Sequence, residues 1–157
     1  MYWKNSKRQR FTYDEIVNIL SKVAKYKKHK IIIGTDSVKL GSEFVFANAI
    51  CVINDNNFYD RRFFYLKRNV LDDSYYDLSK SLLKETTASI DIAFNLKKII
   101  NNANSEIHAD VNSDSKHMSY KYMNMVVGYI KGCGFDCKTK PDSFVASGIA
   151  DVYTRKN

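Results

Sequence analysis

Apolar residues recur along the chain at two spacings, and these spacings divide it into predicted strands and helices. Short runs of β-branched and aromatic residues predict strands at residues 31–36, 44–53, 58–67, 107–111 and 135–140. Apolar positions three and four residues apart predict helices at residues 12–30, 72–101, 117–131 and 143–156. The beginning of the chain is polar and basic and shows no period. We therefore expect a loosely packed basic arm over residues 1–11, followed by a single domain over residues 12–157.

Local signals place the ends of the predicted helices. Thr12 and Glu15 have the spacing of a capping box, which starts the first helix. Gly132 ends the third helix. Pro141 stops the last strand, and we expect Ser143 to cap the helix that follows it.

The predicted elements follow the order helix, three strands, helix, strand, helix, strand, helix. This order is typical of a mixed α/β sheet with helices on its faces. Short turns join the first three strands, so these strands form an antiparallel meander. With right-handed crossovers, the first and fourth strands could lie side by side. Their carboxyl ends would then meet at the edge where α/β proteins usually bind ligands.

Two of the predicted strands end on a carboxylate. Asp36 directly follows the apolar run at residues 31–34, and Asp110 lies near the end of the strand at residues 107–111. Rigid strand ends often carry the reactive groups of an active site. Each aspartate can equally cap the turn that follows its strand, because strand-end aspartates often do so. Either residue alone therefore leaves both interpretations open.

Two further carboxylates come from predicted helices. Glu85 lies two turns from both Leu78 and Ile92, so it falls within the apolar stripe that faces the sheet. A charge buried there needs a cation, a hydrogen-bond donor or a raised pKa, unless the side chain extends to water. Asp151 follows Ser147 by one turn, so these two side chains share a helix face.

Four carboxylates brought together would repel one another unless cations neutralised them. Ligands that are all oxygen atoms select Mg²⁺ or Mn²⁺ over Zn²⁺. Two such ions about 4 Å apart can stabilise both the attacking and the leaving oxygen of an in-line phosphoryl displacement. The predicted metal and catalytic site consists of Asp36, Glu85, Asp110 and Asp151, with Mg²⁺ or Mn²⁺ as the cofactor.

The composition is that of an ordinary globular domain, with 157 residues of which 45% are hydrophobic. The three cysteines are odd in number and lack the spacing of zinc ligands, which argues against a disulfide framework and a zinc site. No run of about 18 apolar residues occurs, and the first residues lack the pattern of a signal peptide. We therefore expect a cytoplasmic protein with no membrane partner.

The formal net charge of +8 favours a polyanionic partner, and nucleic acid is the partner we expect. Basic residues concentrate at residues 4–10, 22–30, 61–68 and 155–156. Such a surface can also serve solubility alone, and the charge does not decide between these interpretations.

Four spaced blocks carry a resemblance to a known family. They are Ile33-Gly34-Thr35-Asp36-Ser37, Leu82-Leu83-Lys84-Glu85 with Ser89, Ile107-His108-Ala109-Asp110-Val111-Asn112, and Lys140-Pro141-Asp142-Ser143 with Ala146-Ser147 and Ala150-Asp151. Together they resemble the YkuK-like bacterial family of the ribonuclease H-like superfamily over residues 12–155. The resemblance implies a five-stranded mixed α/β sheet with strand order 3-2-1-4-5 and helices on both faces. To this fold the chain adds an extra N-terminal helix.

The resemblance also implies roles for the four carboxylates. By analogy, Asp36 bridges two metal ions, with Glu85 and Asp110 on one side and Asp151 on the other. We therefore expect a Mg²⁺- or Mn²⁺-dependent nuclease that hydrolyses phosphodiester bonds of RNA, an RNA/DNA hybrid or structured DNA. Three nearby basic side chains could move protons or hold phosphate: His108, Lys116 and His117.

Two other functions fit parts of the same pattern. One is a non-catalytic nucleic-acid-binding module with a ribonuclease H-like fold. The other is phosphoryl transfer on a nucleotide, as in the kinase relatives of this fold. Against the second alternative, the chain is too short for paired domains and has no glycine-rich phosphate loop.

Overall fold

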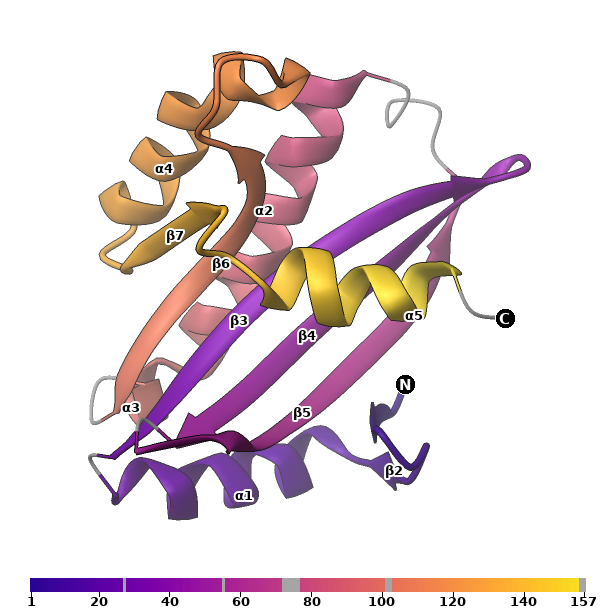
Figure 1. Ribbon diagram of the computed structural model, residues 1–157. Helices are drawn as coiled ribbons and strands as arrows, with labels where there is room; N and C mark the ends of the chain where they lie inside the picture. Colours follow the sequence, from indigo (N-terminus) through magenta and orange to yellow (C-terminus); the bar gives the residue numbers. More distant parts are fainter. Residues whose placement is uncertain (27, 55, 72–76, 101–102, 156–157) are drawn as a thin grey trace.

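The computed structural model describes residues 1–26, 28–54, 56–71, 77–100 and 103–155. The described residues form one mixed sheet with the strand order β2-β1-β5-β4-β3-β6-β7 (Figure 1). Its strands are β1 (Trp3–Asn5), β2 (Arg10–Phe11), β3 (His29–Leu40), β4 (Glu43–Asn54), β5 (Asn57–Val70), β6 (Asn104–Asn112) and β7 (Cys137–Lys140).

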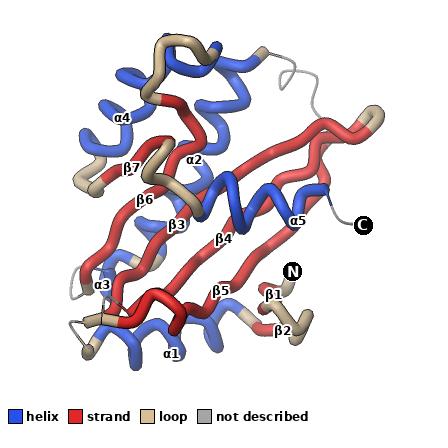
Figure 2. Tube along the Cα trace, viewed as in Figure 1, coloured by secondary structure: helices blue, strands red, loops and turns tan. Residues whose placement is uncertain are grey.

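Helical segments cover both faces of the sheet (Figure 2). They are α1 (Tyr13–Ala24), α2 (Leu78–Asn95), α3 (Lys97–Ile100), the 3₁₀ segment η2 (Met118–Tyr122), α4 (Met123–Gly132), the π-helical segment η3 (Val145–Ala150) and α5 (Asp151–Arg155). Helices α1 to α4 pack on one face, and η3 with α5 crosses the other. Within the described residues, no helix combines the length and the apolar character needed to span a membrane.

Strand β3 lies at the centre of the molecule and is covered on both sides. Ile31 and Ile33 belong to the core beneath α1 to α4, and Ile32 belongs to the core beneath η3. Alternate side chains of a strand point to opposite faces, so an uninterrupted apolar run is what a strand buried on both faces requires. The prediction of a fully buried strand here is confirmed by these two cores.

The register of β3 and β6 explains why their two aspartates lie on the same face. The strands are parallel, with Gly34 opposite His108. Asp36 and Asp110 each follow this pair by two residues, so both side chains point to the same face near the end of the parallel pairing. The predicted contact between the first and fourth strands is therefore confirmed. The five predicted strands also follow the expected order, as β5-β4-β3-β6-β7.

The prediction of a five-stranded sheet is wrong, because the residues that the structure describes form a sheet of seven strands. Both additional strands come from the segment predicted to be a loosely packed arm, so that prediction is also wrong for residues 3–5 and 10–11. Lys4 pairs with Tyr65 of β5, and the Trp3 side chain is only 4% exposed within the core. Strands of three and two residues are too short to show a period in the sequence. The single domain over residues 12–157 stays a prediction.

The first two helices begin with local caps. Thr12 and Glu15 form the predicted capping box: the Thr12 hydroxyl accepts from the Glu15 N–H at 3.3 Å, and the Glu15 carboxylate accepts from the Thr12 N–H at 2.7 Å. The predicted start of the second helix, at residues 72–76, lies outside the described residues. Within them, α2 begins after Asp77, whose carboxylate accepts from the Ser79 N–H at 2.8 Å.

The last helix begins differently from the prediction. Phe144 rather than Ser143 is its N-cap residue, and the cap has no side-chain hydrogen bond of its own. The Ser143 N–H donates to the Thr139 carbonyl at 2.9 Å, so Ser143 still belongs to the turn after β7. Its hydroxyl is buried and has no hydrogen-bond partner among the described residues. The predicted end of this helix, at residue 156, lies outside them.

Gly34 allows the last helix to lie directly on β3. A Cβ atom at this position would come within 2.7 Å of the Ala146 backbone nitrogen and 3.1 Å of the Ala146 Cα. Only glycine permits such a close approach of two backbones without displacing one of them. The helix that carries Asp151 is thereby held against the strand that carries Asp36.

Candidate metal centre

The four carboxylates identified in the sequence line one cavity of about 340 Å³. Asp36 comes from β3, Asp110 from β6, Glu85 from α2 and Asp151 from the start of α5. The remaining lining side chains are Ser37, Leu78, Ser81, Leu82, Ser119, Lys140 and Ser147. The fold thus brings together acidic residues that are up to 115 positions apart in the chain. Their roles as metal ligands and catalytic groups stay a prediction.

The cavity strongly perturbs the pKa of Asp36. The side chain of this aspartate is 8% exposed, and burial together with the charges of Asp110 and Asp151 raises its pKa to about 7. A backbone hydrogen bond from Ser37 and the positive charge of Lys140 act in the opposite direction but are weaker. Without a bound cation, Asp36 therefore carries a proton for much of the time near neutral pH.

Glu85 reaches the same cavity from the opposite face of the sheet. It is 7% exposed, and its Oε1 atom accepts hydrogen bonds from the Ser37 N–H at 3.1 Å and the Ser37 hydroxyl at 2.6 Å. Burial raises its pKa well above the usual range, and the charges of Asp36 and Asp110 add to this rise. The prediction that this glutamate points toward the sheet and needs compensation is confirmed by its burial, its donor and its raised pKa.

Asp110 is paired with a cation of the protein itself. Its Oδ1 atom forms an ion pair with the Lys140 ammonium group and has no hydrogen-bond partner among the described residues. Lys140 is the last residue of β7, which lies beside β6 in the sheet. The sequence contained Lys140 within one of the family-like blocks but gave no sign of its role. Only the parallel pairing of β6 and β7 places its side chain beside Asp110.

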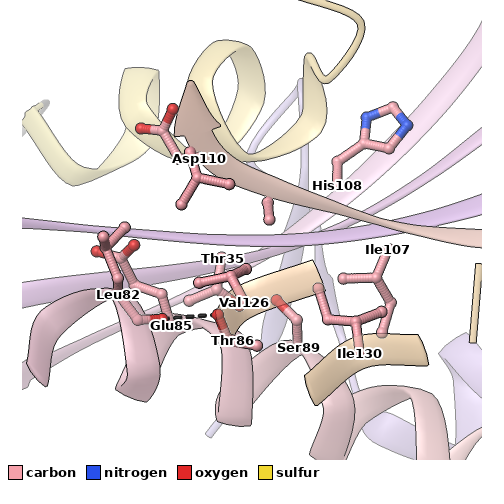
Figure 3. A pocket seen from close by; sticks show the side chains of 12 residues that line it. Thr35, Leu82, Glu85, Thr86, Ser89, Ile107, His108, Asp110, Val126 and Ile130 are labelled. Atoms are coloured by element: carbon pink, nitrogen blue, oxygen red, sulfur yellow. Dashed lines mark hydrogen bonds between the residues drawn. The ribbon is translucent and has the colours of Figure 1, made fainter. Parts of the chain in front are cut away.

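Polar side chains beneath the sheet fix α2 against β3. The Ser89 hydroxyl donates to Thr35 Oγ1 at 2.8 Å, and the Thr35 hydroxyl donates to Asn48 Oδ1 at 3.0 Å. These groups are buried, so the bonds hold α2 in one position relative to the sheet. Figure 3 shows Glu85 and Ser89 on this helix. The carboxylates of Glu85 and Asp110 both lie at the left of this view. The hydrogen bonds of Ser89 and Thr35 therefore fix the helix that carries Glu85 against β3.

The three basic residues proposed as helpers do not line the acidic cavity. The imidazole of His108 is 1% exposed and lies on the same side of β6 as Asp110 but farther along the strand, outside the cavity lining (Figure 3). Its Nε2 atom lies 2.8 Å from Glu106 Oε1, and its Nδ1 atom faces backbone N–H groups. Lys116 and His117 are exposed and are not among the described residues around the cavity. Direct proton transfer or phosphate binding by His108 is therefore excluded by its burial in this arrangement.

The donor set of the cavity suits a hard divalent cation. Its acidic side chains and its serine hydroxyls offer oxygen atoms, which Mg²⁺ and Mn²⁺ prefer. The raised pKa of Asp36 indicates negative charge that a cation would neutralise. Among the described residues, no three acidic, histidine or cysteine side chains are already gathered closely enough to hold a metal. A cation bound here would require side-chain adjustments, including a change in the ion pair between Lys140 and Asp110.

A mixed sheet whose central strands follow the order β5-β4-β3-β6-β7, with helices on both faces, places the protein in the ribonuclease H-like class. A family model described as Ribonuclease H-like matches residues 12–155. The chain belongs to this family, and its resemblance to the YkuK-like branch is confirmed. We found no significant match among curated proteins or among solved structures. Family membership supports a nuclease-type or nucleic-acid-binding fold.

Proposed function

We propose that this protein is a nuclease that requires Mg²⁺ or Mn²⁺ and hydrolyses phosphodiester bonds of RNA, an RNA/DNA hybrid or structured DNA. The observation that carries the proposal is the convergence of Asp36, Glu85, Asp110 and Asp151 on one cavity. Burial and mutual repulsion raise the pKa of Asp36 and of Glu85, so this arrangement costs folding free energy in the absence of a cation. Strongly perturbed carboxylates gathered in a cleft are typical of functional sites.

The four carboxylates would act as the cation ligands. Asp36 would hold cations together with Glu85 and Asp110 on one side and Asp151 on the other. When bound, Mg²⁺ or Mn²⁺ would supply the Lewis acidity that activates water and stabilises the leaving oxygen. The pKa of Asp36 lies at about 7, so cation binding has to displace the proton that this residue holds below that pH.

Ser37 and Lys140 would support the acidic residues. Both Ser37 hydrogen bonds go to Oε1 of Glu85, which orients the carboxylate and leaves Oε2 for a ligand. A cation at Asp110 would release the Lys140 ammonium group, which could then pair with a substrate phosphate. The net charge of +8 would add a general attraction for the nucleic-acid backbone.

Cleavage of labelled RNA, RNA/DNA hybrid, duplex DNA and single-stranded DNA, with Mn²⁺ and with a chelator, tests this proposal. We expect cleavage of at least one substrate with Mn²⁺ and a loss of about 100-fold or more in Asp36→Asn, because a central ligand is removed. Asp91→Asn is the matched control, since Asp91 lies on an exposed part of α2. Inactivity on every substrate, or cleavage unaffected by Asp36→Asn, would overturn the nuclease proposal.

A second candidate function is a nucleic-acid-binding module without turnover. The ion pair between Lys140 and Asp110 favours it, because this ion pair neutralises Asp110 without a metal. Such a module would bind RNA or hybrid in a salt-dependent manner, would keep this affinity in Asp110→Asn and would release no heat on titration with Mn²⁺. The nuclease proposal instead requires Mn²⁺ binding that Asp110→Asn weakens by about 10-fold or more.

A further inference from the structure

His108 is buried at the point where the last helix meets the sheet. Its imidazole lies in T-shaped contact with the Phe144 ring, with 4.9 Å between the ring centroids. Its Nδ1 atom lies 3.1 Å from the Phe144 backbone nitrogen and 3.4 Å from the Val145 backbone nitrogen. Both nitrogens carry hydrogen, so Nδ1 has to be the acceptor and the ring proton has to reside on Nε2.

The other side of the imidazole is held by a buried carboxylate. The Nε2–H group donates to Glu106 Oε1 at 2.8 Å, and Glu106 Oε2 accepts from the Lys30 ammonium group at 3.3 Å. Burial raises the pKa of Glu106, but the hydrogen bond from the His108 ring and the charges of Lys30 and Lys138 act against it, and the pKa is lowered overall. Glu106 therefore stays ionised and fixes the orientation and the tautomer of the ring.

Among the residues that the structure describes, no local cap at the start of the helix that carries Asp151 could replace this contact. Phe144 offers no side-chain hydrogen bond as N-cap, and the Ser143 hydroxyl has no partner among the described residues. The N–H groups at the start of a helix need acceptors from outside the helix. His108 supplies one from strand β6, next to Gly34, which leaves room for the helix backbone.

We propose that His108 is a positioning residue that anchors the start of the last helix and thereby places Asp151 in the acidic cavity. Strand β6 then contributes one cavity carboxylate directly, through Asp110, and orients a second one through the helix. For metal binding this inference rests on the proposed function. The anchoring itself does not, because it consists of hydrogen bonds that form without a cation.

Two substitutions separate the two sides of the imidazole. In His108→Asn, the amide oxygen can occupy the place of Nδ1 and keep the acceptor for the helix, whereas the bond to Glu106 is lost. In His108→Gln, the amide nitrogen can occupy the place of Nε2 and keep the bond to Glu106, whereas the helix loses its acceptor. Both substitutions remove the aromatic ring, so each is the control for the other.

Amide hydrogen exchange at Phe144 and Val145, measured without metal, reports the anchor directly. We expect about 10-fold or greater loss of protection in His108→Gln and a change of less than about 3-fold in His108→Asn. Titration with Mn²⁺ should show a matching loss of about 10-fold or more in affinity for His108→Gln alone. Equal loss of protection in both variants, or unchanged protection in His108→Gln, would overturn the inference.

The wild-type protein provides a test that does not depend on either variant being folded. Nitrogen chemical shifts of the His108 ring should show a protonated Nε2 and an unprotonated Nδ1 in the metal-free protein near neutral pH. The opposite tautomer would overturn the inference, because Nδ1 could then not accept from the helix. Absence of Mn²⁺ binding in the wild type would refute the proposed metal site alone, since the exchange and tautomer measurements use no metal.

Discussion

Replacing Asp36 by asparagine should make the metal-free protein more stable, and the gain should increase with pH. The pKa of Asp36 rises from 3.8 to about 7 in the folded protein, through burial and the charges of Asp110 and Asp151. The folded state therefore holds this proton more tightly than the unfolded state does. The contribution of Asp36 to the free energy of unfolding is consequently highest below about pH 4 and falls as the pH rises toward 7. Asparagine keeps the shape of the side chain and has no proton to lose.

The size of this effect follows from the difference between the two pKa values. Each pH unit between them changes the free energy of unfolding by about 1.4 kcal/mol. From about pH 5 to about pH 8, the stability gained by Asp36→Asn should therefore grow by roughly 2 to 3 kcal/mol. The side chain is only 8% exposed, so solvent screens little of this effect. Neutral asparagine also removes one of the charges that raise the pKa of Glu85.

Denaturant unfolding of the wild type, Asp36→Asn and Asp91→Asn at both pH values, with a chelator present, measures the effect. The free energy of unfolding of the exposed control, Asp91→Asn, should differ from that of the wild type by less than about 0.5 kcal/mol. Addition of Mg²⁺ at the higher pH should then stabilise the wild type more than Asp36→Asn, because the substitution removes a ligand. If the variant gains no stability over the wild type between the two pH values, the reasoning from crowded carboxylates is refuted.

Two other substitutions test the geometry around the cavity. Gly34→Ala should destabilise the protein by about 1 to 3 kcal/mol in denaturant unfolding, because its Cβ would meet the Ala146 backbone at 2.7 Å. Gly128→Ala, which has open space around the added Cβ within α4, should instead be neutral or stabilising, and equal effects would contradict the close approach. Lys140→Met should raise Mn²⁺ affinity by about 3- to 10-fold in calorimetric titration, because the cation no longer competes with an ammonium group for Asp110. Unchanged or weaker binding would show that Lys140 does not occupy the position of the cation.

The central part of the fold could be predicted because its signals are local. The run at residues 31–34 is apolar without interruption because β3 is covered on both faces, and Glu85 falls in the stripe of α2 because helical periodicity puts it there. The same periodicity predicted that Asp151 shares a helix face with Ser147. Both residues line the cavity although this segment is π-helical. Strand ends and helix faces were thus sufficient to identify the four carboxylates.

The features that could not be predicted depend on contacts between distant segments. Trp3 belongs to the core only because the three-residue strand β1 pairs with the edge of β5 through Lys4 and Asn5, and so short a strand has no pattern of its own. Lys140 neutralises Asp110 only through the pairing of β7 with β6. His108 was expected to act near the catalytic groups, but its Nδ1 atom instead accepts a hydrogen bond from the Phe144 N–H at the start of the last helix. Residue types alone do not show which partner a polar side chain will find.

The ends of the sheet bear on the solubility of the protein. Its outermost strands, β2 and β7, have two and four residues, whereas the long strand β5 has fourteen. Short terminal strands offer few unpaired backbone groups to a neighbouring molecule. Beyond its pairing with β1, the β5 edge carries Arg61, Arg62, Lys67 and Arg68, and charged side chains there discourage further strand addition. The N-terminal hairpin thus covers a short part of the β5 edge, and the charged side chains discourage edge-to-edge pairing along the rest.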